Sequence, residues 1–92
     1  MPREHELKTW PAYFEAIVSG EKTFEVRRDD RGFQKGDVLV LQCWNPKVGL
    51  GGRYVNDCFG KPREIRRKIA YVLTGGQFGI EPGFVVMGLK RA

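Results

Sequence analysis

Apolar and polar residues alternate along several stretches of the chain, and this pattern predicts β-strands. The stretches are Thr23 to Arg28, Val38 to Trp44, Ile65 to Leu73 and Phe84 to Leu89. Because successive side chains of a strand point to opposite faces, alternation indicates one face toward a core and one away from it. Val38 to Trp44 is apolar on both faces for much of its length, which suits the wall of a small barrel.

A helical spacing of apolar residues follows Pro11. Tyr13, Phe14, Ile17 and Val18 recur every three to four residues and predict one buried stripe on a helix of about ten residues. Proline is typical of a first helical turn, and Thr9 just upstream is a candidate cap. Gly20 supplies the left-handed residue that commonly ends a helix.

Glycine and proline interrupt the pattern between these elements. Asp29 to Gly32 and Gly36-Asp37 have turn chemistry, and the stretch from Asn45 to Arg63 has no readable period. A loop of that length is more often functional than decorative. With a short segment at Glu4 to Lys8, the chain contains one helix and about five strands. We therefore expect a single domain over residues 1–92, of α+β (mainly β) class, built as a small barrel with the helix packed on one side.

The segment from Ser19 to Asp37 concentrates charge on the first clear strand. By alternation, Phe24 and Val26 are predicted to point into the core, while Glu25 and Arg27 point the other way as a charged row. Lys22 would share a face with Phe24, so a contact between Lys22 and Glu25 requires a bend at the start of the strand. Gly20 would permit that bend.

Charge and cysteine content narrow the class of protein. The chain has 16 Lys and Arg against 11 Asp and Glu, a net charge of +5, which favours a polyanionic partner and serves solubility equally well. The two cysteines are expected to be free thiols, with Cys43 the more buried and Cys58 in a loop. The sequence shows no signal peptide or membrane-spanning run, so we expect a cytoplasmic protein. One histidine and two separated cysteines predict no metal site, and nothing indicates a cofactor.

A basic group lies at the start of the strand near residue 65. Its members, Lys61, Arg63, Arg66 and Lys68, are candidates for a phosphate track, because Arg66 and Lys68 share a strand face and the other two extend from the loop. The same charges would also protect an edge strand from aggregation.

Three segments resemble a known family. GEKTFEVR, from Gly20 to Arg27, matches the G-x-K-x-x-E-x-R signature of the ASCH domain, a branch of the PUA-like superfamily. The longer segments His5 to Arg27, Phe33 to Trp44 and Arg63 to Leu73 resemble a small bacterial and phage subgroup of unknown function. The resemblance implies a PUA-like barrel of about five to six strands, with a cleft against the helix that relatives use to bind RNA or nucleotides and, in some, to cut them.

The resemblance also suggests catalytic candidates, Lys22 and Glu25. One ASCH branch resembles amidohydrolases that remove the acyl group of N4-acetylcytidine with the motif lysine, a threonine three residues later and a later glutamate. Lys22 matches the lysine, but Glu25 occupies the threonine position, and neither Glu64 nor Glu81 matches the later glutamate. Cys43 also departs from the subgroup, which usually has an acidic residue before the tryptophan.

These observations define a predicted binding cleft and leave each role open. Its candidates are His5, Lys8, Trp10, Lys22, Glu25, Arg27 and Trp44. Lys22 is a base, a nucleophile or a solvated lysine, and Glu25 reads a base edge or forms a structural ion pair with Arg27. The tryptophans stack on a base or belong to the core, and His5 is a base-reading donor, a general base or ordinary surface.

The leading hypothesis is an RNA-binding or nucleotide-binding module, with one base in the cleft and its backbone on the basic track. The main alternative is a hydrolase acting on N4-acylated cytidine, or a ribonuclease. A third is a phage-type module that binds another protein.

Overall fold

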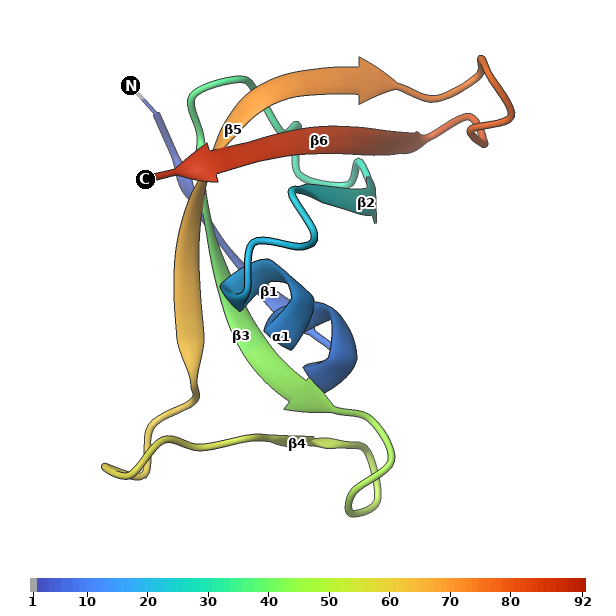
Figure 1. Ribbon diagram of the computed structural model, residues 1–92. Coiled ribbons are helices and arrows are strands. Elements are labelled where there is room, and N and C mark those ends of the chain that lie inside the picture. The colour runs from blue at the N-terminus through green and yellow to red at the C-terminus, as the bar shows by residue number, and fades with distance from the viewer. Residues whose placement is uncertain (1) are drawn as a thin grey trace.

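The computed structural model of the protein describes residues 2–92, which form one short helix and six strands (Figure 1). In chain order these are β1 (Glu4–Thr9), α1 (Pro11–Val18), β2 (Phe24–Arg28), β3 (Val38–Asn45), β4 (Arg53–Tyr54), β5 (Glu64–Thr74) and β6 (Phe84–Arg91). The helix and the four strands predicted from the pattern are all present, with ends shifted by one or two residues. None of the helical structure within residues 2–92 is long and apolar enough to cross a membrane.

The strands form one strongly curved sheet in the order β1-β3-β5-β6-β2, and β4 adds a short pairing to β3. β1 runs parallel to β3, whereas the other pairs are antiparallel. β5 pairs with β3 in its first half and with β6 in its second, and the register shifts between Ile69 and Tyr71. An extra residue of this kind bends a strand, and β5 visibly changes direction between its two partners (Figure 1).

The curved sheet remains open between its two edge strands, β1 and β2. No ladder joins them within residues 2–92, but arginine side chains cross the gap. Arg27 on β2 donates from Nη2 to the carbonyl oxygen of Lys8 at 2.7 Å, and Arg31 donates from Nη1 to that of Glu6 at 2.8 Å. The closed barrel predicted from the sequence is therefore not formed by backbone pairing. What the structure shows is a small, mainly-β domain of six strands with one helix.

Helix α1 lies inside the curve of the sheet and contributes one face to the core (Figure 1). Phe14 and Ile17 are buried, but Tyr13 and Val18 are exposed, so the predicted stripe is only half buried. Thr9 is not the cap that was predicted. It is the last residue of β1, and the N-cap is Trp10, which has an extended backbone and makes no side-chain cap. Gly20 has φ +83° and ends the helix as expected.

The core fills the concave side of the sheet around one side of the helix. Its buried members are Leu7, Ile17, Phe33, Leu39, Leu41, Ile69, Val85 and Met87. They come from β1, α1, β3, β5, β6 and the segment after β2, so every long strand except β2 contributes. On the convex side, Val40 is also buried, beneath the polar side chains of neighbouring strands.

The enclosed and exposed faces of β2 are the reverse of those predicted from the sequence. Glu25 is only 4% exposed, whereas Phe24 and Val26 are 45% and 51% exposed, so the apolar residues are outside and the carboxylate is inside. The alternation was read correctly, but the assignment of its two faces was wrong. The reason is that the inward face of β2 lies opposite α1 and the end of β1, where two cations compensate the buried carboxylate.

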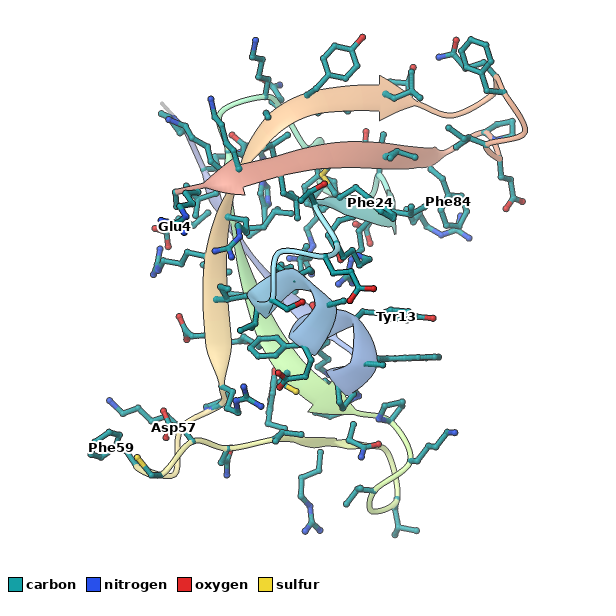
Figure 2. All side chains as sticks on the ribbon, viewed as in Figure 1. Glu4, Tyr13, Phe24, Asp57, Phe59 and Phe84 are labelled. Atoms are coloured by element: carbon teal, nitrogen blue, oxygen red, sulfur yellow. The ribbon has the colours of Figure 1, made fainter. Side chains whose placement is uncertain are left out.

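The long stretch after β3 is partly ordered by backbone pairing. β4 pairs with the end of β3, and Asn56 forms an isolated bridge with Pro62. Gly52 packs directly against the ring of Trp44, so closely that a Cβ built there would lie 2.5 Å from the indole. Farther along, the side chain of Phe59 projects from the loop into solvent (Figure 2). The predicted unstructured loop therefore contains a short hairpin-like arm.

Candidate functional site

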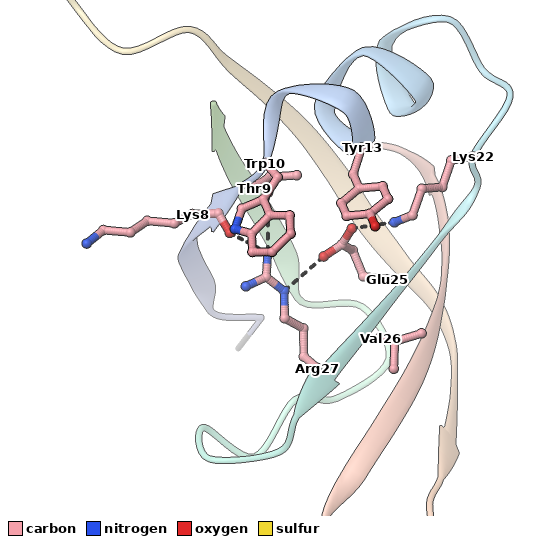
Figure 3. Close-up of a pocket in the computed structure, with 8 residues that line it drawn as sticks. All are labelled: Lys8, Thr9, Trp10, Tyr13, Lys22, Glu25, Val26 and Arg27. Atoms are coloured by element: carbon pink, nitrogen blue, oxygen red, sulfur yellow. Dashed lines mark hydrogen bonds and ion pairs between the residues drawn. The ribbon is translucent and has the colours of Figure 1, made fainter. Parts of the chain in front are cut away.

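A cleft of about 490 Å³ opens between the end of β1, the start of α1 and β2 (Figure 3). Its walls are formed by Lys8, Thr9, Trp10, Tyr13, Lys22, Glu25, Val26 and Arg27. The lining combines a buried carboxylate, the two cations paired with it and two exposed aromatic rings. The open edge of the sheet creates this space, since no strand within residues 2–92 pairs across it.

The carboxylate of Glu25 is held between two cations at the base of the cleft. Lys22 Nζ lies 2.6 Å from Oε1, and Arg27 Nε donates to Oε2 at 2.9 Å (Figure 3). The side chain of Glu25 is 5% exposed, against 17% for Lys22 and 25% for Arg27. A carboxylate has about four acceptor positions. Each oxygen of Glu25 therefore keeps capacity for a further hydrogen bond from a ligand.

Arg27 links the carboxylate to the opposite edge of the sheet. Besides its bond to Glu25, its Nη2 donates to the carbonyl oxygen of Lys8 and, at 3.3 Å, to the hydroxyl of Thr9. These three hydrogen bonds fix the orientation of the guanidinium group. Arg27 positions Glu25 and also forms a bridge of hydrogen bonds across the gap between β1 and β2.

Lys22 comes from the turn before β2 and reaches back over the start of that strand. Its ammonium also donates to the carbonyl oxygen of Phe24 at 2.6 Å and lies 4.9 Å from the centre of the Phe24 ring. The bend expected near Gly20 is present, because β2 begins only at Phe24 and Lys22 meets Glu25. In these contacts Lys22 acts as a donor, whereas a nucleophile or a base must offer a lone pair.

Two aromatic rings form the rim of the cleft. Trp10 and Tyr13 are 53% and 52% exposed, and their rings stack with centroids 6.1 Å apart and planes 17° from parallel. Trp10 precedes Pro11, which disfavours a helical backbone and keeps Trp10 extended. One turn of helix then brings Tyr13 beside it. Burial cannot explain these two rings, because half of each remains in solvent.

The structure brings together five of the seven predicted cleft residues, namely Lys8, Trp10, Lys22, Glu25 and Arg27. Lys8 takes part through its backbone, since its side chain points away and lies 4.0 Å from the centre of the Trp44 ring (Figure 3). Trp44 itself is partly buried outside the cleft, edge to face with Tyr54 at 4.8 Å. Trp44 is therefore placed as a packing residue.

His5 also lies away from the cleft. It is buried, donates from Nε2 to Asp37 Oδ2 at 2.9 Å and packs edge to face on Phe33. Burial raises the pKa of Asp37, but the hydrogen bonds from His5 and from the backbone N–H groups of Arg3 and Gln34 outweigh it and lower that pKa overall. His5 therefore serves the packing of β1 against the turn before β3.

The predicted phosphate track is occupied in part by carboxylates. Arg66 lies 2.6 Å from Glu4, and Arg63 forms an ion pair with Glu15. The hydrogen bond to Glu4 is the main reason that the pKa of Arg66 is raised. Arg66 and Lys68 face the convex side of the sheet, where Glu4 and Glu6 lie on the same face of β1. Two of the four cations are therefore already paired.

The two cysteines differ in exposure. Cys43 is buried and Cys58 is exposed, as predicted, and burial raises the pKa of the Cys43 thiol above its ordinary value.

Tyr13, Thr9 and Val26 line the cleft without having been predicted there. Tyr13 was read as part of the buried stripe, and only its place on the first helical turn after Trp10 could have indicated otherwise. No group of three metal-ligating side chains occurs within residues 2–92.

The fold and the cleft define a small, mainly-β domain with a buried, doubly paired carboxylate beneath an aromatic rim. The chain belongs to the family described as "Domain of unknown function (DUF3850)", whose sequence pattern matches residues 4–89. It is similar to the "Uncharacterized 12.9 kDa protein in GpA 3'region" of Escherichia phage P2, with 39% identity over 51 residues. That similarity covers 55% of this chain and 47% of the phage protein, so the chain spans about half the length of the curated relative.

Proposed function

We propose that this protein binds a nucleotide or RNA and holds one base in the cleft formed by β1, α1 and β2. The observation that carries the proposal is Glu25, a carboxylate 4% exposed, fixed from two sides and adjacent to a cleft with a stacking rim. A buried carboxylate is costly unless it is paired, and here the pairing leaves acceptor positions free. Such an arrangement suits a ligand that offers N–H groups.

The chemistry of Glu25 favours the amino group of a base as the group recognised. Carboxylates accept from the N4 amino group of cytosine, and a fixed carboxylate discriminates more sharply than a rotating hydroxyl. Lys22 and Arg27 hold both oxygens in place, so little orientation is lost when a ligand binds.

The aromatic rim supplies the second part of recognition. Trp10 and Tyr13 are exposed, lie side by side and border the same cleft as Glu25. Stacking of a base on such a ring contributes about 1 to 3 kcal/mol and tolerates any base. Stacking would therefore supply affinity, and Glu25 would supply selectivity.

The sequence adds two supporting arguments. The net charge of +5 attracts a polyanion. The resemblance of Gly20 to Arg27 to the ASCH signature points to PUA-like domains, in which the corresponding cleft takes RNA or nucleotides. We propose that the curved, open sheet of this protein is a variant of that fold.

The hydrolase alternative depends on Lys22, whose ammonium donates to Glu25 and Phe24. Incubation with N4-acetylcytidine distinguishes the two functions. We expect no turnover above the uncatalysed rate. Turnover by the parent protein that disappears in Lys22→Ala would show that the cleft is an active site.

Binding is tested by calorimetric titration with the four ribonucleosides and with short single-stranded RNA. Tyr13→Ala should weaken binding about 5-fold to 150-fold, the equivalent of one lost stacking contact. Tyr71→Ala is the matched control, because Tyr71 is 64% exposed and does not line the cleft. Glu25→Gln should reduce the preference among bases more than it reduces overall affinity. Equal effects of the two tyrosine substitutions, or an absence of binding at low salt, would refute the proposal.

A further inference from the structure

Two pairs of cations lie at the paired ends of β5 and β6, one pair on each face of the sheet. The register places Arg67 directly opposite Arg91, and Lys68 directly opposite Lys90. Like charges directly opposite each other in an antiparallel pair destabilise the sheet. Two consecutive pairs of this kind are unfavourable for folding, so the folded protein alone gives no reason for them.

None of these four side chains forms an ion pair with another residue of the described range 2–92. The carboxylates that pair with arginines and lysines elsewhere, such as Glu4, Glu15 and Glu25, contact other cations. Arg67 donates only to carbonyl oxygens, those of Arg66 and Ile17. The charge of the four cations is therefore uncompensated within this part of the molecule.

Three of the four cations line a second pocket of about 270 Å³. Its walls are formed by Ile17, Val18, Ser19, Gly20, Lys22, Thr23, Arg67, Leu89, Lys90 and Arg91. This set, which we call the basic pocket, contains no carboxylate side chain. Lys22 is paired with Glu25, and Lys90 lies opposite Lys68 on the convex face of the sheet, so Arg67 and Arg91 are the cations whose side chains serve the pocket. Thr23 adds a hydroxyl that can donate a hydrogen bond. The chemistry of the lining is that of a site for a doubly or multiply charged oxyanion.

The basic pocket adjoins the cleft that contains Glu25, because Lys22 lines both of them. The turn that carries Lys22 and Thr23 separates the two spaces, between the end of α1 and β2 (Figure 1). A ligand with its base in the cleft could therefore extend past Lys22 and place a charged group in the basic pocket.

We propose that the basic pocket binds a phosphate group of the ligand whose base occupies the cleft. The phosphate is either that of a free nucleotide or the backbone phosphate next to a bound base of RNA. This inference rests on the proposed function for the position of the base, but the charge arrangement on β5 and β6 supports an anion site independently. Arg67 and Arg91 offer planar guanidinium groups, which bind phosphate oxygens in pairs.

The basic pocket suits a phosphate better than the track predicted from the sequence. Arg63 and Arg66 of that track would have to release Glu15 and Glu4 before binding, whereas Lys90 and Arg91 have no carboxylate to release. Arg67 has a structural role as well, since its Nη2 lies 3.4 Å from the carbonyl oxygen of Ile17 near the end of α1. That role does not account for Lys90 or Arg91, which are exposed on β6.

The test compares two single variants that remove the same charge. Arg91→Gln changes the basic pocket, and Arg53→Gln changes an exposed arginine that lines neither pocket. Each substitution lowers the formal charge from +5 to +4 by removing one positive group. Long-range attraction to a polyanion is thus reduced by a similar amount in both. The probes are each ribonucleoside, its 5′-diphosphate, a trinucleotide without terminal phosphates, and inorganic pyrophosphate.

In the parent protein we expect a phosphorylated probe to bind at least about 10-fold more tightly than the nucleoside, equivalent to about 1.4 kcal/mol. The Arg91 variant should reduce that advantage to about 2-fold or less, while the Arg53 control retains most of it. Nucleoside affinity should be the same in both. Thermal melting of the Arg91 variant should match or exceed that of the parent, because the like-charge contact with Arg67 has been removed.

The outcomes separate this inference from the proposed function. If nucleosides bind but phosphorylated probes bind no more tightly, the basic pocket is not a phosphate site and the base cleft stands. If pyrophosphate binds and needs Arg91 but nucleosides do not bind, the pocket stands and the base cleft is wrong. Equal losses in the Arg91 and Arg53 variants would refute the pocket, since they would show only long-range attraction. A gain with the diphosphate indicates a free nucleotide, and a gain with the trinucleotide alone indicates RNA.

Discussion

Replacing Glu25 with alanine tests whether the ion pairs of the cleft hold the open edge of the sheet together. The substitution removes two charge-assisted hydrogen bonds, from Lys22 at 2.6 Å and from Arg27 at 2.9 Å. It also leaves two cations around a space that was 4% exposed when filled by Glu25. The structure therefore predicts a loss of stability, although the residue lies in the candidate ligand site.

The expected size of the loss follows from the exposure of the partners. Removing one member of a fully buried ion pair costs about 3 to 5 kcal/mol, because the partner charge remains buried without compensation. Here the Lys22 and Arg27 side chains are 17% and 25% exposed, so part of their charge can be hydrated. We expect the free energy of unfolding to fall by about 3 kcal/mol. In a domain of this size that lowers Tm by about 12 to 24 °C.

Urea unfolding at neutral pH measures this change in the free energy of unfolding directly. The m-value, which is the dependence of that free energy on urea concentration, should be the same as in the parent protein. Glu21→Ala is the control, because Glu21 is an exposed glutamate in the same turn and has no ion pair within residues 2–92. Its effect should stay within about 0.5 kcal/mol. In a double-mutant cycle, Glu25→Ala and Arg27→Ala should show a coupling energy of about 1 to 3 kcal/mol. A loss below about 1 kcal/mol for Glu25→Ala, or additivity in the cycle, would refute the structural role of the pair.

Two further predictions concern residues outside the cleft. Trp44→Ala should lower the free energy of unfolding by about 2 to 3 kcal/mol, less than for a fully buried tryptophan, because Trp44 packs on Gly52 and Tyr54 but is partly exposed. Nucleoside binding by the folded variant should be unchanged, and a variant that melts like the parent but no longer binds would make Trp44 a ligand contact instead. Asp37→Asn should be destabilising at pH 7 and progressively less so as the pH falls below 3.8, as measured by urea unfolding across a series of pH values. The pKa of Asp37 is lowered by folding, so its ionised form stabilises the protein above the ordinary pKa of 3.8, and this contribution disappears as the pH falls through the lower folded-state pKa. A loss that stays constant across the series would show that the hydrogen-bond geometry, and not the charge of Asp37, is what matters.

Local sequence patterns predicted most of the secondary structure. The helix start at Pro11, the left-handed end at Gly20 and the four main strands depend on nearest-neighbour geometry, which the sequence expresses directly. The burial of Cys43 was also predictable, because it lies on the same face of its strand as Leu39 and Leu41. The charged motif from Lys22 to Arg27, singled out by its resemblance to the ASCH signature, lines a cleft in the structure, and its role as a binding site stays a prediction.

The assignment of faces required the tertiary structure. Alternation along β2 shows that Glu25 and Phe24 lie on opposite sides, but it does not show which side is enclosed. The enclosed side is decided by α1 and by the end of β1. β1 lies at the opposite end of the sheet order from β2 and supplies Arg27 with acceptors from Lys8 and Thr9. For the same reason, Tyr13 could not be separated from the buried stripe of the helix by its spacing alone.

Electrostatic partners were likewise set by the fold. The sequence showed which residues are cations, but only strand pairing placed Arg66 beside Glu4 and set Arg67 and Lys68 opposite Arg91 and Lys90. For these cations, the presence or absence of a neutralising partner depends on contacts between residues more than 20 positions apart, which no local pattern encodes. The sequence by itself therefore determined the elements and the charged motif, whereas the curvature of the sheet decided which charges are paired, which are free and where the clefts open.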